Sequence, residues 1–163
     1  MRYLALGALA CLLLTGTPAF AQPPDAAVTA PITAFITAFN KGDVAGAAAT
    51  HAAVPDLVII DEVAPYAWHG PKAFHAWAAD LGTSESKRGI TDQKVVIGAP
   101  TRVEVEGTSG YVIVPATYTY SEKGVAMRAV SQMTVVLKKG ASGWLIHGWT
   151  WTGPKASKAG TAK

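Results

Sequence analysis

Residues 111–152, YVIVPATYTYSEKGVAMRAVSQMTVVLKKGASGWLIHGWTWT, decide the fold because they contain three long strand-like runs. The runs Tyr111–Tyr120, Val125–Lys138 and Trp144–Thr152 are rich in valine, threonine, tyrosine and tryptophan, which favour strands. Their separators, SEKG and KGASG, consist of turn-forming residues. A fourth run, Lys94–Glu106, precedes these three and is separated from them by the turn-like sequence GTSG. Consecutive strands joined by short turns predict an antiparallel meander.

The N-terminal half reads as helical apart from one short strand. In its first helix the apolar residues recur at spacings of three and four, which predicts one buried stripe. We expect helices over 28–40, 44–51 and 72–81, a strand over 56–61, a loop over 64–71 and a polar connection over 82–93. Pro31 is expected in the first turn of its helix, and Pro100 and Pro115 at bulges or sheet edges. Helices that lead into an antiparallel sheet indicate an α+β domain of two layers, whose curled sheet leaves one open end.

The two ends of the chain are expected to lie outside this domain. Residues 1–21 have the early positive charge, the apolar run and the Ala-Phe-Ala ending of a secretory signal peptide. We therefore expect a periplasmic or secreted protein cleaved after Ala21, with a lipoprotein signal at Cys11 as the weaker alternative. Residues 22–27 are expected to be a linker, 28–153 the domain and 154–163 a disordered tail.

Charge and residue counts exclude several classes of function. The chain has 14 Lys and Arg against 11 Asp and Glu, but four of the cations lie at its ends. The domain is therefore about neutral and has no basic face for nucleic acid. The four histidines lack metal-ligand spacing, and neither a Gly-x-Ser-x-Gly elbow nor a glycine-rich phosphate loop is present. We expect no metal site and no cofactor.

The order of these elements resembles that of the SnoaL-like and ketosteroid-isomerase-like members of the nuclear transport factor two-like superfamily. The resemblance covers residues 26–153, and FITAFNKGD (35–43), DLVIIDE (56–62), PYAWHGPKAF (65–74) and GWLIHGWTWTG (143–153) carry it. It implies a cone-like fold, in which a strongly curved antiparallel sheet wraps around three N-terminal-half helices and encloses a cavity, often in a homodimer. It does not imply one reaction, since members include isomerases, cyclases, dehydratases and non-catalytic binders.

Asp61 is the first candidate for a functional group. Alternation along the strand puts Leu57, Ile59 and Asp61 on one face. Desolvation at the end of an apolar face raises the pKa of a carboxyl group, which tunes it for general acid or base catalysis. The alternative is a structural aspartate that caps the following loop through its backbone amides.

The aromatic loop that follows offers further candidates. Tyr66 is the hydrogen-bond donor to a substrate oxyanion that the resemblance to ketosteroid isomerases implies, and Trp68 is expected to contact a ligand. Alternatively, both aromatic side chains pack over the mouth of the cone. His69 is expected to be a surface or hydrogen-bonded histidine.

The last strand has a strongly aromatic face, formed by Leu145, His147, Trp149 and Trp151. A tight KGASG turn would place Thr134 opposite His147. The same register would place Gln132 opposite Trp149 and would add Arg128 to the same surface. Such a mixed aromatic and polar surface suits a ligand cavity, and it equally suits a dimer interface.

We therefore expect an exported protein that binds a small apolar or aromatic ligand in its cone. If it is an enzyme, we expect cofactor-free isomerisation, dehydration or hydrolysis, with Asp61 or His147 as the base and Tyr66 as the oxyanion donor. The expected ligand contacts are Trp68, Gln132, Trp149 and Trp151. The alternative is a non-catalytic periplasmic ligand-binding or dimerisation module. No nucleic-acid partner and no stable membrane insertion after signal cleavage are expected.

Overall fold

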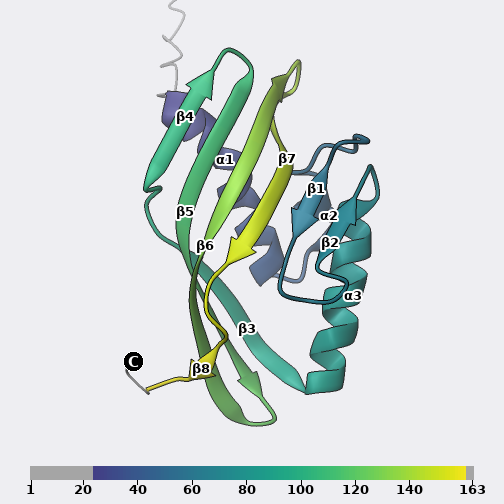
Figure 1. Cartoon of the computed structure of the whole chain (residues 1–163), viewed down its shortest axis with the longest axis vertical. Coiled ribbons are helices and arrows are strands. Elements are labelled where there is room, and N and C mark those ends of the chain that lie inside the picture. Colours follow the sequence, from purple (N-terminus) through teal and green to yellow (C-terminus); the bar gives the residue numbers. More distant parts are fainter. Residues whose placement is uncertain (1–23, 161–163) are drawn as a thin grey trace, which may run out of the picture.

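The computed structural model describes residues 24–160, so the predicted signal peptide lies outside the described residues. The elements, shown in Figure 1, are α1 (Pro24–Asn40), α2 (Val44–Ala48), β1 (Val58–Ile60), β2 (Ala67–His69), α3 (Ala73–Arg88), β3 (Ile90–Ile97), β4 (Arg102–Glu106), β5 (Ser109–Glu122), β6 (Val125–Gly140), β7 (Gly143–Thr152) and β8 (Ser157–Lys158). No helix within this part of the chain is long and apolar enough to span a membrane.

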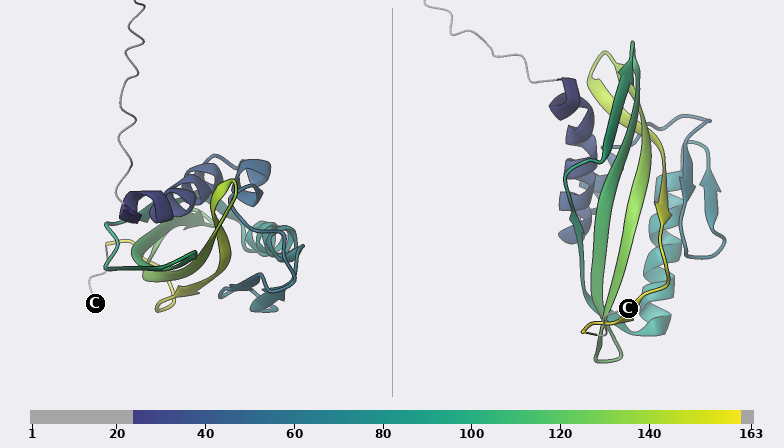
Figure 2. Two further views of the ribbon diagram at one scale, coloured as in Figure 1. Left: turned by 90° about the horizontal axis from the view of Figure 1, so that it is seen from above. Right: turned by 60° about the vertical axis from the view of Figure 1, so that its left-hand side comes forward.

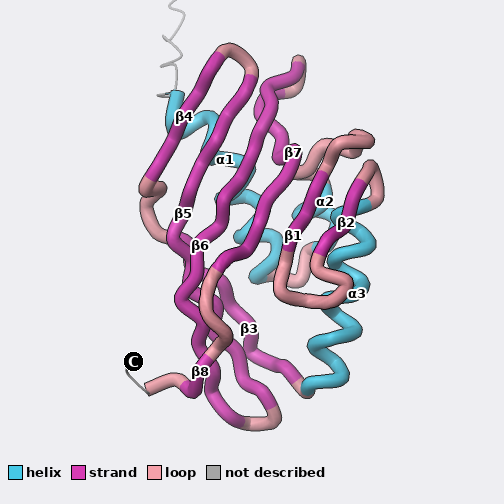
Figure 3. The backbone as a smooth tube through the Cα atoms, in the orientation of Figure 1, coloured by secondary structure: helices cyan, strands magenta, loops and turns pink. Residues whose placement is uncertain are grey.

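The strands form one sheet in the order β2-β1-β7-β6-β5-β3, with β4 also pairing with β5 and β8 with β6. Every pair is antiparallel except β1 with β7, which is parallel. Seen from above, the sheet curls, α1 runs across its open side and α3 lies beside β1 and β2 (Figure 2). The tube in Figure 3 shows that β5 and β6 bend along most of the length of the molecule. The predicted α+β class with a strongly curved sheet and N-terminal helices is confirmed.

Several of the predicted element boundaries are wrong. The expected loop over 64–71 contains β2, which pairs with β1 through Ile59↔Trp68. The helix expected to end at residue 81 continues to Arg88, where Gly89 adopts φ +68° and ends it. The single strand expected over 94–106 is two strands, because the chain leaves the sheet between Ile97 and Arg102.

The prolines explain where the sheet and the first helix depart from regularity. Pro115 lies in β5 between the segments that pair with β3 and with β4, and its carbonyl accepts a hydrogen bond from the Gly98 amide at 2.9 Å. A residue without an N–H is tolerated there because β3 has ended and β4 has not yet begun, so the ladder on that edge is interrupted. Pro31, in contrast, lies inside α1, which begins at Pro24. The helix therefore starts earlier than predicted and continues through a proline.

The C-terminal tail is also more ordered than expected. Arg128 of β6 pairs with Ser157 and Met127 with Lys158, and the Ala159 amide donates to the Ala126 carbonyl at 2.8 Å. These backbone hydrogen bonds supply the order that the small, polar composition of the tail did not predict.

The core lies between α1 and the concave face of the sheet. The apolar stripe that was predicted for the first helix is buried there, and Phe39 lies partly buried at the edge of this stripe. The aromatic ring of Phe35 packs against the rings of Trp77 from α3 and Trp149 from β7, at centroid distances of 6.0 and 5.7 Å. Leu57 and Ile59 of the β1 region are fully buried whereas Ile60 is exposed, as the predicted alternation requires.

His51 is the one polar side chain that is buried among the described residues. Its Nε2 accepts a hydrogen bond from the indole Nε1–H of Trp149 at 3.0 Å, so Nδ1 carries the proton and donates to the Ala47 carbonyl at 3.0 Å. Burial lowers the pKa of His51 to about 4. The imidazole is therefore neutral in the folded protein at neutral pH and holds Trp149 in place.

The end of α1 is joined to the open edge of β3 by one side chain. The Asn40 amide nitrogen donates to the Val95 carbonyl at 2.8 Å, and its oxygen accepts from the Val95 N–H at 2.8 Å. Asn40 thus satisfies the backbone N–H and C=O of Val95 in the edge strand β3, as a neighbouring strand would.

We predict that Asn40→Ala lowers the free energy of unfolding by about 1–3 kcal/mol, because both backbone groups of Val95 lose their partner. Asn40→Asp, which keeps the acceptor but loses the donor, should lie between wild type and Asn40→Ala. The measurement is urea unfolding, with the exposed neighbour substitution Lys41→Ala as control. A wild-type midpoint for Asn40→Ala would contradict this role.

A second prediction concerns the pH dependence of stability. The unfolded His51 takes up a proton at about pH 6.5 and the folded one only at about pH 4. The contribution of the neutral imidazole is therefore complete above pH 6.5 and falls by up to about 3 kcal/mol as the pH drops to 4.

The stability advantage of wild type over His51→Gln should shrink over this range in urea unfolding measured at each pH. Contributions from carboxyl groups are common to both proteins and cancel in the difference. The same substitution at the exposed His69 is the control. A difference between wild type and His51→Gln that stays constant from pH 7 to pH 4 would show that His51 is not the group responsible.

Candidate functional site

A cavity of about 630 Å³, including its opening to solvent, lies between the curled sheet, the C-terminal half of α1 and the inner face of α3. Its apolar walls are Phe35, Ile36, Phe39, Val63, Trp77, Leu81, Ile90, Val95, Met133, Trp149 and Trp151. Its polar lining is Asp61, Glu62, Ser84, Glu85, Arg88 and Tyr118. Apolar walls with a few polar groups are typical of a site for a small molecule.

Asp61 lies at the lip of this cavity, directly after β1. Its Oδ2 accepts a hydrogen bond from the indole Nε1–H of Trp77 at 2.7 Å, and its Oδ1 accepts from the Glu62 amide at 2.7 Å. The carboxylate therefore caps the loop, as the structural interpretation expected, and it also lines the cavity; its catalytic role stays a prediction. Desolvation raises the pKa of Asp61, and the two hydrogen bonds oppose this because they favour the charged form.

A second carboxyl group, Glu85 of α3, lines the same cavity. Its Oε2 accepts from the Gln93 amide nitrogen at 3.1 Å, and its Oε1 lies 3.4 Å from the Tyr118 hydroxyl. The Tyr118 hydroxyl in turn donates to Gln93 Oε1 at 2.9 Å. Burial raises the pKa of both Glu85 and Tyr118. At Glu85 the hydrogen bonds with Gln93 and Tyr118 and the charge of Arg88 oppose this shift, and the charge of Asp61 adds to it.

Arg88 is the one cation among the described residues that line the cavity. Its guanidinium is already engaged, because Nε and Nη2 donate to the two carboxylate oxygens of Glu122 at 3.0 Å each, and Nη2 also donates to the Tyr120 hydroxyl at 3.0 Å. These hydrogen bonds raise the pKa of Arg88. Arg88 thus ties the end of α3 to β5 rather than pairing with a cavity carboxylate.

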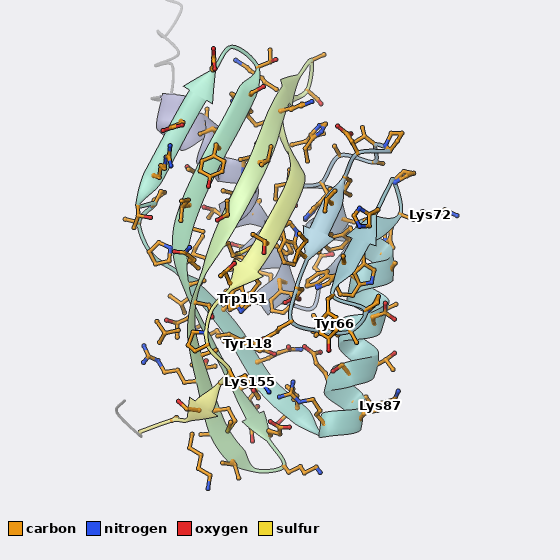
Figure 4. The ribbon with its side chains drawn as sticks, viewed as in Figure 1. Tyr66, Lys72, Lys87, Tyr118, Trp151 and Lys155 are labelled. Carbon is orange, nitrogen blue, oxygen red and sulfur yellow. The ribbon has the colours of Figure 1, made fainter. Side chains whose placement is uncertain are left out.

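Two of the tryptophans predicted as ligand contacts, Trp149 and Trp151, line the cavity. Figure 4 shows Trp151 near Tyr118, and their ring centroids are 6.4 Å apart in an edge-to-face arrangement. Trp149 packs edge-to-face on Trp77 at 5.1 Å. These two tryptophans of the last strand therefore face the cone.

Tyr66 and Trp68, the predicted candidates of the aromatic loop, lie outside the cavity lining. Tyr66 is 60% exposed in the turn between β1 and β2, with φ +77°, and Figure 4 places it on that connection. Trp68 is buried in β2, and its indole N–H donates to Asp80 of α3 at 2.8 Å. Strand formation by residues 67–69 turned Trp68 into the core between β2 and α3.

His147 and Gln132 are also outside the lining, because the predicted register of the last hairpin is displaced by three residues. Gln132 pairs with Thr152 and Thr134 with Thr150. The turn lies one residue later than expected, between Gly140 and Gly143, and a bulge leaves His147 without a partner in β6.

The consequence of this register is that polar residues expected in the cone lie on other surfaces. Gln132 is exposed. His147 lies near Asp56, with Nδ1 and Oδ1 3.9 Å apart. Desolvation lowers the pKa of His147.

Several lining residues were not among the predicted candidates. Ser84, Glu85 and Arg88 belong to the part of α3 that was predicted to be a polar connection, so their helical spacing was not used. The signal was present, since Trp77, Leu81, Ser84 and Arg88 recur at spacings of three and four. Within residues 24–160 no group of three or more His, Cys, Asp or Glu could hold a metal ion.

No family model matches the sequence, and no curated protein matches it. Solved structures do match. A ketosteroid isomerase-like protein from Erwinia carotovora atroseptica is 24% identical, with a TM-score of 0.60 over 86% of this chain and 99% of that one. A nuclear transport factor 2-like superfamily protein from Salmonella enterica serovar Typhimurium is 16% identical, with a TM-score of 0.65 over 83% and 94%.

A type 2 hexachlorocyclohexane dehydrochlorinase is 12% identical, with a TM-score of 0.67 over 85% of this chain and 90% of that one. At these identities the likeness concerns the fold, which the helix order and the curled sheet reproduce. The chain therefore has the cone fold of the nuclear transport factor 2-like superfamily.

Proposed function

We propose that this protein binds a small apolar or aromatic molecule in its cone and moves a proton on it, with Asp61 as the base. The observation that carries this proposal is a desolvated carboxylate at the lip of an aromatic cavity, oriented by the indole of Trp77. Such a group removes a proton from carbon more readily than a solvated carboxylate does, because desolvation raises its basicity.

The cavity walls support the choice of ligand. Six aromatic side chains line it, and the one cation among its described lining residues is already paired with Glu122, so an anionic ligand would have to compete with that carboxylate. The flat, apolar surfaces of Trp149 and Trp151 suit a ring. No redox or group-transfer step is needed for isomerisation or elimination.

The named functions of proteins with the same fold are consistent with this proposal. One is described as ketosteroid isomerase-like and another as a hexachlorocyclohexane dehydrochlorinase. Fold likeness alone does not choose a reaction, so the proposal depends on Asp61 and its surroundings. The oxyanion role expected of Tyr66 finds no support, since its side chain is exposed outside the cavity.

We predict that Asp61→Asn lowers turnover at least about 100-fold on whichever member of a ketosteroid, β-hydroxy-acid and lactone panel the wild type converts. The amide oxygen can still accept from Trp77, so the fold should be retained. The matched control is Asp80→Asn, because Asp80 holds the indole of Trp68 at 2.8 Å in the same way but lies outside the cavity.

Equal rates for wild type and Asp61→Asn would remove Asp61 from the mechanism. Ligand binding without turnover in either protein would instead support the alternative of a non-catalytic binding module. Tryptophan fluorescence measures that binding, because Trp77, Trp149 and Trp151 all line the cavity.

Export is a further part of the proposal, supported by the signal-like sequence of residues 1–21. The protein expressed in a bacterium should be released by osmotic shock, and N-terminal sequencing should begin at Gln22. Retention in the cytoplasm with Met1 or Arg2 at the N-terminus would contradict export.

A further inference from the structure

We propose that Glu85 is the proton donor that complements Asp61, so that the cone carries a matched acid and base. This inference rests on the proposed function and deepens it. It implies a class of substrate in which an oxygen atom takes up a proton while a neighbouring carbon atom loses one.

The first argument is the direction of the hydrogen bonds around Glu85. Gln93 Oε1 can only accept, so the Tyr118 hydroxyl gives its proton to Gln93 at 2.9 Å. The contact of 3.4 Å between Tyr118 and Glu85 Oε1 is then left without the tyrosine proton. A proton on Glu85 supplies the missing donor.

The alternative orientation of the Gln93 amide leads to the same result. If the amide is turned over, its oxygen faces Glu85 Oε2 at the 3.1 Å position now held by nitrogen. Two oxygens at that distance need a proton between them, and only Glu85 can provide it. In either orientation the network is complete when Glu85 is a neutral acid.

The second argument is the contrast with Asp61. Both oxygens of Asp61 accept N–H hydrogen bonds, which favour its ionised form. Glu85 receives one such bond, and the guanidinium of Arg88, whose charge favours the ionised form of Glu85, is hydrogen-bonded to Glu122 and not to Glu85. The other charged or titratable groups that face Glu85 are Asp61, Glu62 and Tyr118, and the charge of Asp61 further disfavours a second carboxylate in the cavity.

The third argument is placement. Asp61 directly follows β1, whereas Glu85 lies on α3, the helix whose Trp77 donates to Asp61. The two carboxyl groups therefore enter one lining from different elements. A ring system bound between them would present a C–H to one and an oxygen to the other.

The step balances without a co-reactant. Asp61 takes a proton from carbon, and the electron pair of the C–H bond forms a new π bond. The displaced electron pair ends on oxygen, which takes the proton of Glu85 and either leaves as water or a phenol or stays as an enol. A proton then passes from Asp61 back to Glu85 through solvent.

Two aromatic probes separate the acid from the base. In 1,2-benzisoxazole, removal of the C3 proton breaks the N–O bond and releases 2-cyanophenolate, which benefits from a proton donor. In 5-nitro-1,2-benzisoxazole the nitrophenolate leaves without one. We expect Glu85→Gln to lower kcat on the unsubstituted probe at least 10-fold and on the nitro probe less than 3-fold, with little change in KM.

Asp61→Asn should lower the rates on both probes at least about 100-fold, and Glu106→Gln, an exposed glutamate on β4, is the control. With the unsubstituted probe, the wild-type rate should fall at high pH because Glu85 loses its proton. This fall should be absent in Glu85→Gln. Equal losses on the two probes, or no loss on either, would overturn the role of Glu85 while leaving Asp61 as the base. No effect of Asp61→Asn, or a wild-type rate equal to that of buffer, would overturn the proposed function and this role with it.

A titration decides the protonation state without any substrate. In protein labelled with ¹³C at the glutamate side-chain carboxyl, the Glu85 resonance, identified by its loss in Glu85→Gln, should titrate at a higher pH in the folded protein than in the urea-unfolded protein. Titration of Glu85 over the same range in both states would overturn the neutral acid.

Discussion

The cavity depends on one aromatic junction, where Phe35 of α1, Trp77 of α3 and Trp149 of β7 meet. The three ring centroids lie 5.1 to 6.0 Å from one another. A buried indole needs an acceptor for its N–H, and the two tryptophans find theirs in opposite directions. Trp149 donates inward to His51, and Trp77 donates to Asp61 at the lip. The same packing that closes the core therefore places a carboxylate at its boundary.

The two acceptors are suited to different environments. A neutral imidazole can be buried completely when its other nitrogen donates to a carbonyl, as His51 does to Ala47. A carboxylate cannot be buried in this way without a large cost, so Asp61 lies where the sheet ends and solvent or ligand begins. The tryptophan pair thus separates a sealed core from an open cone, and β7 contributes to both.

Much of the fold could be predicted from the sequence because it depends on periodic signals. The stripe of α1 and the alternation of Leu57 and Ile59 depend only on local geometry, and both are observed. The course of residues 64–71 could not be predicted, because two prolines and a glycine mask a three-residue strand that forms only when β1 is present to pair with it.

The site was harder to predict because it depends on register. One bulge at His147 and a turn one residue later than expected moved the polar partners of the last strand out of the cone, whereas Trp149 and Trp151 stayed on the inner face. Asp61 was found because it ends an apolar face. Glu85 was missed because α3 was predicted to end at residue 81, about two turns too early, before the turn that carries Glu85.

The energetics of the site are consistent with a functional role for its acids. Desolvation raises the folded-state pKa of Asp61 and of Glu85 above their unfolded values. Between the unfolded and folded pKa values the native state therefore binds more protons, so the contribution to stability is complete below the unfolded pKa and is lost as the pH rises through the folded pKa. A neutral isostere at either position would avoid this loss. Fixed hydrogen bonds orient both carboxyl groups, and such orientation at the expense of stability is typical of residues selected for chemistry rather than for folding.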